Sequence, residues 1–218
     1  MQLTRKRIIA TAMELIERDG VEAVSMRRLA TELGCGVMSL YSHVPSKPAL
    51  LDGVAEAVMS GIEIVPAAGD CWQQQIRAQA TAFRQIARAH PRCAMVVASR
   101  PLSSARIVRP LEAALATLRA AGFGGQESVR IVRALAAYLV GSLLREAGAA
   151  PGLADASDDG SHRPRLPAAE FPQLSELAAE LSDRDPDADF EFGLDLLLGA
   201  AAALTDYGRT QQILCTQP

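Results

Sequence analysis

Side chains that can bind phosphate groups or the edges of bases recur over one short stretch of the chain, residues 25–47. Guanidinium and ammonium groups pair with phosphate oxygens, and hydroxyl and imidazole groups hydrogen-bond to phosphates or to bases. We therefore expect contacts with a nucleic acid from this stretch. The side chains suited to them are those of Arg27, Arg28, Ser39, Tyr41, His43 and Lys47.

Two short helices are predicted to position these side chains. Ser25 can cap a first helix, in which Met26, Leu29, Ala30 and Leu33 recur at helical spacing. Gly34 allows the left-handed backbone that ends such a helix, and a second helix of about residues 37–43 must leave at a steep angle. This is the helix-turn-helix arrangement, in which the second helix enters the DNA major groove.

Two other classes of function compete with DNA binding. One is a helical enzyme, but the three histidines lie far apart at 43, 90 and 162, and neither a nucleophile motif nor a phosphate-binding loop occurs. The other is a helical interaction protein that never touches DNA. A DNA-binding protein should bind bulk DNA at low salt, whereas such an interaction protein should not.

Composition favours an all-α protein with one substantial core. The chain has 218 residues, 49% of them hydrophobic and only 4% aromatic. Residues 1–48 carry seven Lys and Arg against five Asp and Glu, so a weakly basic head precedes an acidic body. The longest apolar run is far too short to span a bilayer, and we expect a cytoplasmic protein without a membrane association. The four cysteines show neither close pairing nor metal-ligand spacing, so we expect no zinc site and no disulfide framework. We predict no metal and no cofactor for the protein.

Apolar periodicity predicts further helices around the pair. A helix capped by Thr4 runs to about Arg18, and a fourth begins at Ser46 and links the head to the body. Further helices are expected over about 71–90, 103–121, 126–146, 173–181 and 188–206, with a short apolar segment at 93–98 and a loop at 151–172. The basic residues Arg5, Lys6 and Arg7 either touch phosphate or form a solvated surface.

The chain resembles the TetR family of one-component repressors. The segments that carry the resemblance in the head are SMRRLATELG, YSHV and SKPALLDGVA. The body resembles the tetracycline-repressor branch through CWQQQIRAQATAFR, ASRP, LRAAGF and FEFGLDLLLGA. In the family arrangement Val37, Met38 and Ser39 face bases, so here two apolar side chains would contact thymine methyl groups. With Ser25, they complete the predicted DNA-binding set.

The resemblance also implies the overall mechanism. It implies a head of residues 1–47 and a ligand-binding and dimerisation domain of residues 48–218. A homodimer would bind double-stranded operator DNA, and a small-molecule inducer in the body would shift the two heads apart and release the operator. The helices at 126–146 and 188–206 carry apolar faces that suit a four-helix dimer interface.

The same branch holds its drug as a magnesium chelate, through a histidine and an acidic residue. Those positions match Val96 and Arg145 here, and a cation would repel the metal. We therefore expect a mostly apolar inducer bound without metal. The predicted ligand-binding residues are Gln79, Phe83, Val96, Arg100 and Leu115, although ordinary packing for Phe83 and a solvated surface for Arg100 stay open as alternatives.

Overall fold

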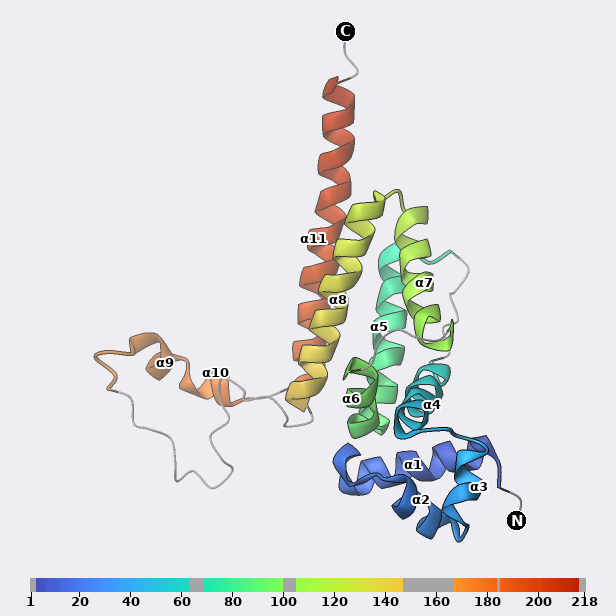
Figure 1. Cartoon of the computed structure of the whole chain (residues 1–218). Coiled ribbons are helices and arrows are strands. Elements are labelled where there is room, and N and C mark those ends of the chain that lie inside the picture. The colour runs from blue at the N-terminus through green and yellow to red at the C-terminus, as the bar shows by residue number, and fades with distance from the viewer. Residues whose placement is uncertain (1–2, 63–68, 100–104, 147–166, 184, 216–218) are drawn as a thin grey trace. The chain divides into compact units, whose positions relative to one another are not determined.

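The computed structural model describes residues 3–62, 69–99, 105–146, 167–183 and 185–215, and omits the side chains of 105–107 and 205–215. Helices and turns account for the described part of the chain, and it contains no strand (Figure 1). The predicted all-α class is therefore confirmed. Contacts divide the chain into two compact units, Met1–Ala134 and Leu135–Pro218.

Helix α1 spans Arg5–Asp19 and begins and ends where the sequence predicts. The hydroxyl of Thr4 accepts a hydrogen bond from the Arg7 backbone N–H at 3.3 Å. Gly20, with φ of 85°, closes the helix through a bond from its N–H to the Ile16 carbonyl. A 3-10 turn, η1, follows at Val21–Ala23.

The predicted pair of short helices is present as α2, Met26–Leu33, and α3, Val37–Tyr41. One buried core joins them to α1 and α4. Its largest fully buried members from these helices include Ile8, Leu15, Ile16, Leu29, Leu40 and Leu50. The orientation of α3 therefore follows from side chains packed in a common core rather than from its five residues alone.

Helix α4, Lys47–Ser60, begins at the predicted cap, because the Ser46 hydroxyl accepts from the Ala49 N–H at 3.2 Å. It packs against α1 and α6 and against α7, so it joins the head to the helices that follow. Gly53 lets α4 approach α1 closely. A Cβ at this position would overlap the Ile9 Cδ1 atom and would lie 3.2 Å from Arg5 Nη2.

Three more helices complete the first unit up to the start of α8. Helix α5 spans Trp72–Ala89, α6 spans Pro91–Ser99 and α7 spans Ala105–Ala120, with Pro110 inside α7. The segment at 93–98, which we expected only as a short apolar segment, belongs to α6. The predicted start of α7 at residue 103 lies outside the described residues.

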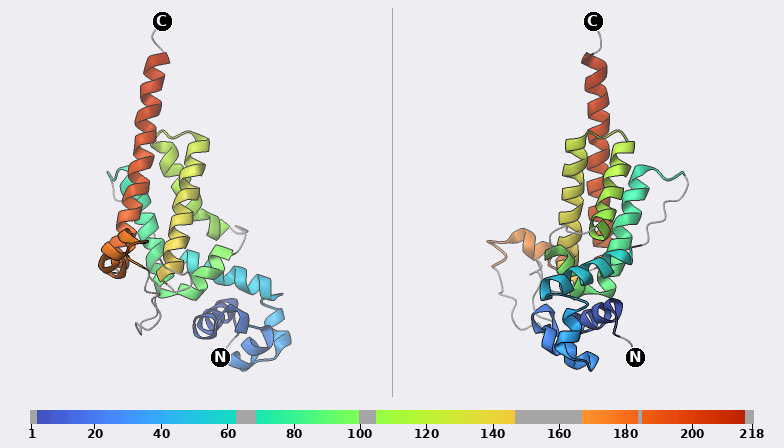
Figure 2. Two further views of the ribbon diagram at one scale, coloured as in Figure 1. Left: turned by 90° about the vertical axis from the view of Figure 1, so that its left-hand side faces the viewer. Right: turned by 45° about the vertical axis from the view of Figure 1, so that its right-hand side comes forward.

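Helix α8, Gly125–Glu146, continues from the first unit into the second, where α11, Pro186–Cys215, runs beside it (Figure 2). Tyr138 of α8 donates to the Phe190 carbonyl at 2.8 Å, and the two rings stack with centroids 5.9 Å apart. Gly193 leaves room for the Tyr138 ring. In place of one short helix at 173–181 the structure has two, α9, Pro172–Glu176, and α10, Ala178–Ser182. Most of the predicted loop at 151–172 lies outside the described residues.

The two compact units defined by contacts have other bounds than the two predicted domains, residues 1–47 and 48–218. Helices α4 and α6 pack with α1 in one unit, and the boundary between units falls within α8. The predicted division concerns roles rather than packing, and it stays a prediction.

Candidate nucleic-acid interface and ligand-binding residues

Helix α3 is held by buried side chains and presents other side chains to solvent. Leu40 is fully buried and Val44, just beyond the helix, is 1% exposed. On the same short helix Met38 is 81% exposed and Tyr41 is 42% exposed, while Ser39 and His43 are exposed as well. Because α3 cannot turn without pulling Leu40 from the core, it presents one defined face to a partner.

The turn between α2 and α3 has the geometry that the glycines predicted. Gly34 adopts φ 63° and ψ 36°, and its N–H bonds back to the Thr31 carbonyl at 3.1 Å. The Cys35 N–H donates to the Ala30 carbonyl at 3.0 Å. Gly36 then caps α3 with extended backbone. The carbonyls at the end of α2 are thus satisfied inside the turn, so the turn holds the angle between the two helices.

The basic residues of the predicted interface differ in what they already contact. Arg27 at the start of α2 is exposed. The Arg28 guanidinium pairs with the Asp19 carboxylate at 2.5 Å, and Lys47 Nζ donates to the Val21 carbonyl at 3.4 Å. Ser25 uses its hydroxyl to accept from the Arg28 N–H at 3.2 Å. Arg28, Lys47 and Ser25 therefore have structural roles in the head, and any DNA contact would add to these.

Asp19 is the acidic centre of a small ion-pair network at the end of α1. Arg18 lies 2.9 Å from Asp19 and 2.7 Å from Glu32, so it ties α1 to α2. The hydrogen bond from Arg18 lowers the pKa of the Asp19 carboxyl, and Arg28 and Arg92 add a Coulombic effect of the same sign. The network links α1 to α2 at two points, Arg28 and Glu32.

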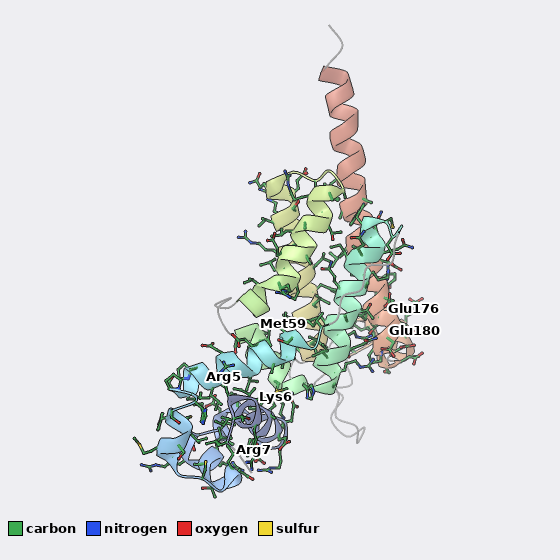
Figure 3. All side chains as sticks on the ribbon, turned by 90° about the vertical axis from the view of Figure 1, so that its right-hand side faces the viewer. Arg5, Lys6, Arg7, Met59, Glu176 and Glu180 are labelled. Atoms are coloured by element: carbon green, nitrogen blue, oxygen red, sulfur yellow. The ribbon has the colours of Figure 1, made fainter. Side chains whose placement is uncertain are left out.

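The basic N-terminal residues lie at the start of α1, near α4 (Figure 3). The Arg5 guanidinium pairs with Glu56 of α4 at 3.5 Å. Lys6 is exposed and Arg7 is half-buried. Arg5 therefore has a partner within the protein. For the exposed Lys6, both alternatives, contact with phosphate and a solvated surface, stay predictions.

The predicted ligand-binding residues that the structure describes lie on α5, α6 and α7, and α5 packs against both α6 and α7. Phe83 is half-buried and packs with Ala55 and Met59 of α4, together with Val97 of α6. Met59 is labelled in Figure 3 on α4. Gln79 and Leu115 are half-buried. Arg100 lies outside the described residues.

Val96 has a second set of contacts that the sequence did not indicate. It is 3% exposed and belongs to the core that α1, α2, α3 and α4 share. Its role in binding a ligand stays a prediction, and its packing shows that α6 contributes directly to the core of the head.

A cavity of about 250 Å³ opens between α1, α4 and α5. Its lining includes Met13, Val58, Gly61, Ile86 and His90. Its lining contains none of the predicted ligand-binding residues that the structure describes. The cavity and the predicted ligand site are therefore different places in the unit.

Among residues 3–62, 69–99, 105–146, 167–183 and 185–215, no three His, Cys, Asp or Glu side chains gather in a metal-binding group. Arg145, at the position that is acidic in the tetracycline-repressor branch, lies 4.0 Å from the Asp189 carboxylate at the start of α11. In the part of the chain that the structure describes, no helix is long and apolar enough to cross a membrane.

Sequence reasoning missed Glu17, Arg92 and Cys93, which join α1 to α6. The sequence does contain a signal for the start of α6, namely Pro91, because proline is common at the first position of a helix. With α6 recognised, a carboxylate one helix away could have been sought as the partner of its first N–H groups.

The fold and the exposed face of α3 define a class of protein, the helix-turn-helix DNA-binding proteins. Two family models match the chain. "Bacterial regulatory proteins, tetR family" covers residues 8–54, and "Tetracyclin repressor-like, C-terminal domain" covers residues 65–203. The chain belongs to the TetR family of transcriptional regulators, and it is a ligand-responsive DNA-binding regulator.

Individual relatives agree with this assignment. The tetracycline repressor protein class C of Escherichia coli is 32% identical over 202 residues, which are 91% of this chain and 90% of that protein. An HTH-type transcriptional regulator of Saccharopolyspora erythraea is 35% identical over 144 residues, 66% of this chain, and the match spans only 61% of that relative. The solved structure of the Streptomyces coelicolor TetR family protein ActR in complex with actinorhodin has a TM-score of 0.80 and 30% identity, covering 93% of this chain and 98% of that one.

Proposed function

We propose that this protein is a repressor that binds a palindromic operator as a homodimer and reads it with α3. The observation that carries the proposal is the contrast along that helix, where Leu40 is fully buried and Met38 is 81% exposed. An exposed thioether on a rigid helix is suited to contact with thymine methyl groups in the major groove. Ser39 and Val37 flank Met38 on α3; Ser39 is exposed, whereas Val37 is half-buried and packs against the core of the head.

Phosphate contacts would come from the residues around this face. Groups that bind phosphate oxygens occur within α3 or close to it in the sequence, on Arg27, Tyr41, His43 and Lys47. Arg28 and Ser25 would act mainly by holding the start of α2 in place, because both already have partners in the head. Lys47 would bind a phosphate group, and the hydrogen bond from its ammonium group to the Val21 carbonyl would orient it.

The dimer would form through the outer face of α11 with α8. Phe192, Leu196 and Leu204 of α11 are 66%, 59% and 50% exposed. Exposed apolar side chains at spacings of four and eight residues on one helix indicate a face that is covered by another copy. Two heads on one dimer require two half-sites in the operator.

The inducer would be a mostly apolar small molecule bound without metal or other cofactor. The residues that we propose for its binding are Gln79, Phe83, Val96 and Leu115, together with Arg100, which lies outside the described residues. Phe83 offers a ring for stacking and Gln79 an amide, while Arg145 places a positive charge near Asp189 instead of a metal-binding acid. ActR is a structural relative that binds actinorhodin, which supports an organic inducer rather than an ion. We propose no enzymatic activity, and a cytoplasmic location where operator DNA is accessible.

Selection of duplexes from a pool of genomic fragments tests the proposal. The purified protein should enrich fragments that share an inverted repeat, and the complex should contain two protein copies for each repeat. Thermal-shift screening of neutral and acidic apolar compounds, with and without magnesium, should then find stabilising ligands that release the enriched duplex. Enrichment of no shared sequence would contradict operator recognition, and stabilisation only with magnesium would contradict the metal-free site.

A further inference from the structure

The first turn of α6 is joined to the last turn of α1 by hydrogen bonds that span more than seventy residues of sequence. One oxygen of the Glu17 carboxylate accepts from the Cys93 N–H at 2.8 Å, and the other accepts from the Arg92 N–H at 3.3 Å. The first N–H groups of a helix have no partner within the helix. Glu17 of the head therefore caps α6, and its negative charge lies at the positive end of that helix.

Arg92 returns the contact in the opposite direction. Its Nη1 atom donates to the Glu17 carbonyl at 3.2 Å and to the Arg18 carbonyl at 2.9 Å. These carbonyls belong to the C-terminal turn of α1, where a positive charge is stabilising. Each helix thus satisfies the free end groups of the other, and we call this set of bonds between Glu17, Arg92 and the Cys93 N–H the α1–α6 latch.

Packing around the α1–α6 latch continues toward the predicted ligand site. Cys93 is fully buried in the core of the head, and its thiol lies 3.7 Å from the Met13 carbonyl of α1. One turn further along α6, Val97 packs both on this core and on the cluster of Met59 and Phe83. Helix α6 therefore contacts the head at its first turn and, near its end, the cluster of Ala55 and Met59 on which the predicted ligand residue Phe83 also packs.

We infer that Glu17 and Arg92 are positioning residues that couple α6 to the reading head through the α1–α6 latch. Any displacement of α6 must either carry the end of α1 with it or break four hydrogen bonds to charged groups. The inference rests on the proposed function, since it assigns the latch a part in operator binding and release. It predicts that binding of DNA at α3 is felt by the backbone of α6, far from the DNA.

Hydrogen exchange of the Arg92 and Cys93 amides, with and without a saturating duplex enriched by the wild-type protein, tests this coupling. In the wild type the duplex should slow exchange of these amides severalfold, because it holds the head in the latched position. In Glu17→Ala the exchange of the free protein should be faster by about tenfold, and the duplex at saturation should no longer change it. Glu14→Ala, which removes another carboxylate of α1, is the matched control and should behave as the wild type.

Conservative and double variants separate coupling from loss of structure. Glu17→Gln and Arg92→Lys keep part of the bonding and should retain part of the response to duplex. Glu17→Ala combined with Arg92→Ala should lose no more coupling than either change alone, because both break one unit. A full exchange response to duplex in Glu17→Ala, or none in a wild type saturated with duplex, would overturn the inference while leaving operator binding intact. Failure to enrich any duplex contradicts the proposed function itself, and with it the role of the latch.

Discussion

Lys47 shows how a residue predicted to bind phosphate acquires a second role from its surroundings. Its ammonium group donates to the carbonyl of Val21, the first residue of the 3-10 turn between α1 and α2. We predict that Lys47→Ala weakens binding to all duplexes alike and lowers the slope of log affinity against log salt by about one, as expected for one lost phosphate contact. Titrations at several salt concentrations measure the slope. An unchanged slope with weaker binding would assign Lys47 to the Val21 bond alone.

Cys93 gives a residue-level prediction for pH. Burial, together with the hydrogen bond to Glu17, raises the pKa of its thiol. A raised pKa in the folded state means that the unfolded chain loses this proton first. The contribution to stability is therefore full below the unfolded pKa of about 8.5 and decreases as pH rises above it.

Urea unfolding of the wild type and of Cys93→Ala between about pH 7.5 and 10 measures this effect. The wild type should lose stability with pH more steeply than the variant, by up to about 1.4 kcal/mol for each pH unit. The comparison between the two slopes removes the contribution of other titrating groups. Equal slopes for both proteins would show that the thiol ionises as easily in the fold as in the unfolded chain.

The sequence predicted residues whose role is local. Thr4, Ser25 and Ser46 cap helices as expected, and Gly34 adopts the left-handed backbone. It could not predict that Arg28 pairs with Asp19 or that Val96 enters the core of the head. Those contacts depend on where distant helices cross, which no local pattern encodes.

At the scale of elements, the close approach of α1 and α4 rests on Gly53. We predict that Gly53→Ala destabilises the protein by about 1 kcal/mol, because displacement of the end of Ile9 by the added methyl group outweighs the gain in helix propensity. Thermal or urea unfolding measures the change. In an Ile9→Val background, which lacks the overlapping Cδ1 atom, the same substitution should cost clearly less. An equal cost in both backgrounds would mean that the clash is not the cause.

Helix α6 was the element that sequence reasoning failed to find. Its nine residues carry apolar side chains on more than one face because the helix packs on two clusters, so no single apolar stripe marks it as a helix. The helix is stabilised instead by capping from Glu17 and by burial of Cys93 and Val96. Helix α11, by contrast, was found from its periodic stripe, since Phe190, Leu194, Leu198 and Ala201 are all buried.

At the scale of the whole molecule, the exposed face of α11 predicts the assembly. Leu196→Glu should place a charge in the interface between copies and give a monomer, which would bind the enriched duplex at least about a hundredfold more weakly. Sedimentation velocity at micromolar concentration measures the assembly. Met38→Glu is the matched control, because its side chain is even more exposed but lies on α3.

The control should lose DNA binding and remain a dimer. A wild type that sediments as a monomer, or a Leu196→Glu variant that remains a dimer, would contradict the assignment of this face. The outcome also bears on the predicted roles of residues 1–47 and 48–218, because it separates loss of reading from loss of assembly.

A hydroxyl-radical footprint on the enriched duplex tests most directly the claim that α3 reads an operator as part of a dimer. We predict two protected half-sites of equal size, related by two-fold symmetry and separated by a whole number of helical turns, about 10 base pairs each. Both should disappear with Met38→Glu. A single asymmetric footprint, or protection that persists unchanged in Met38→Glu, would contradict the account.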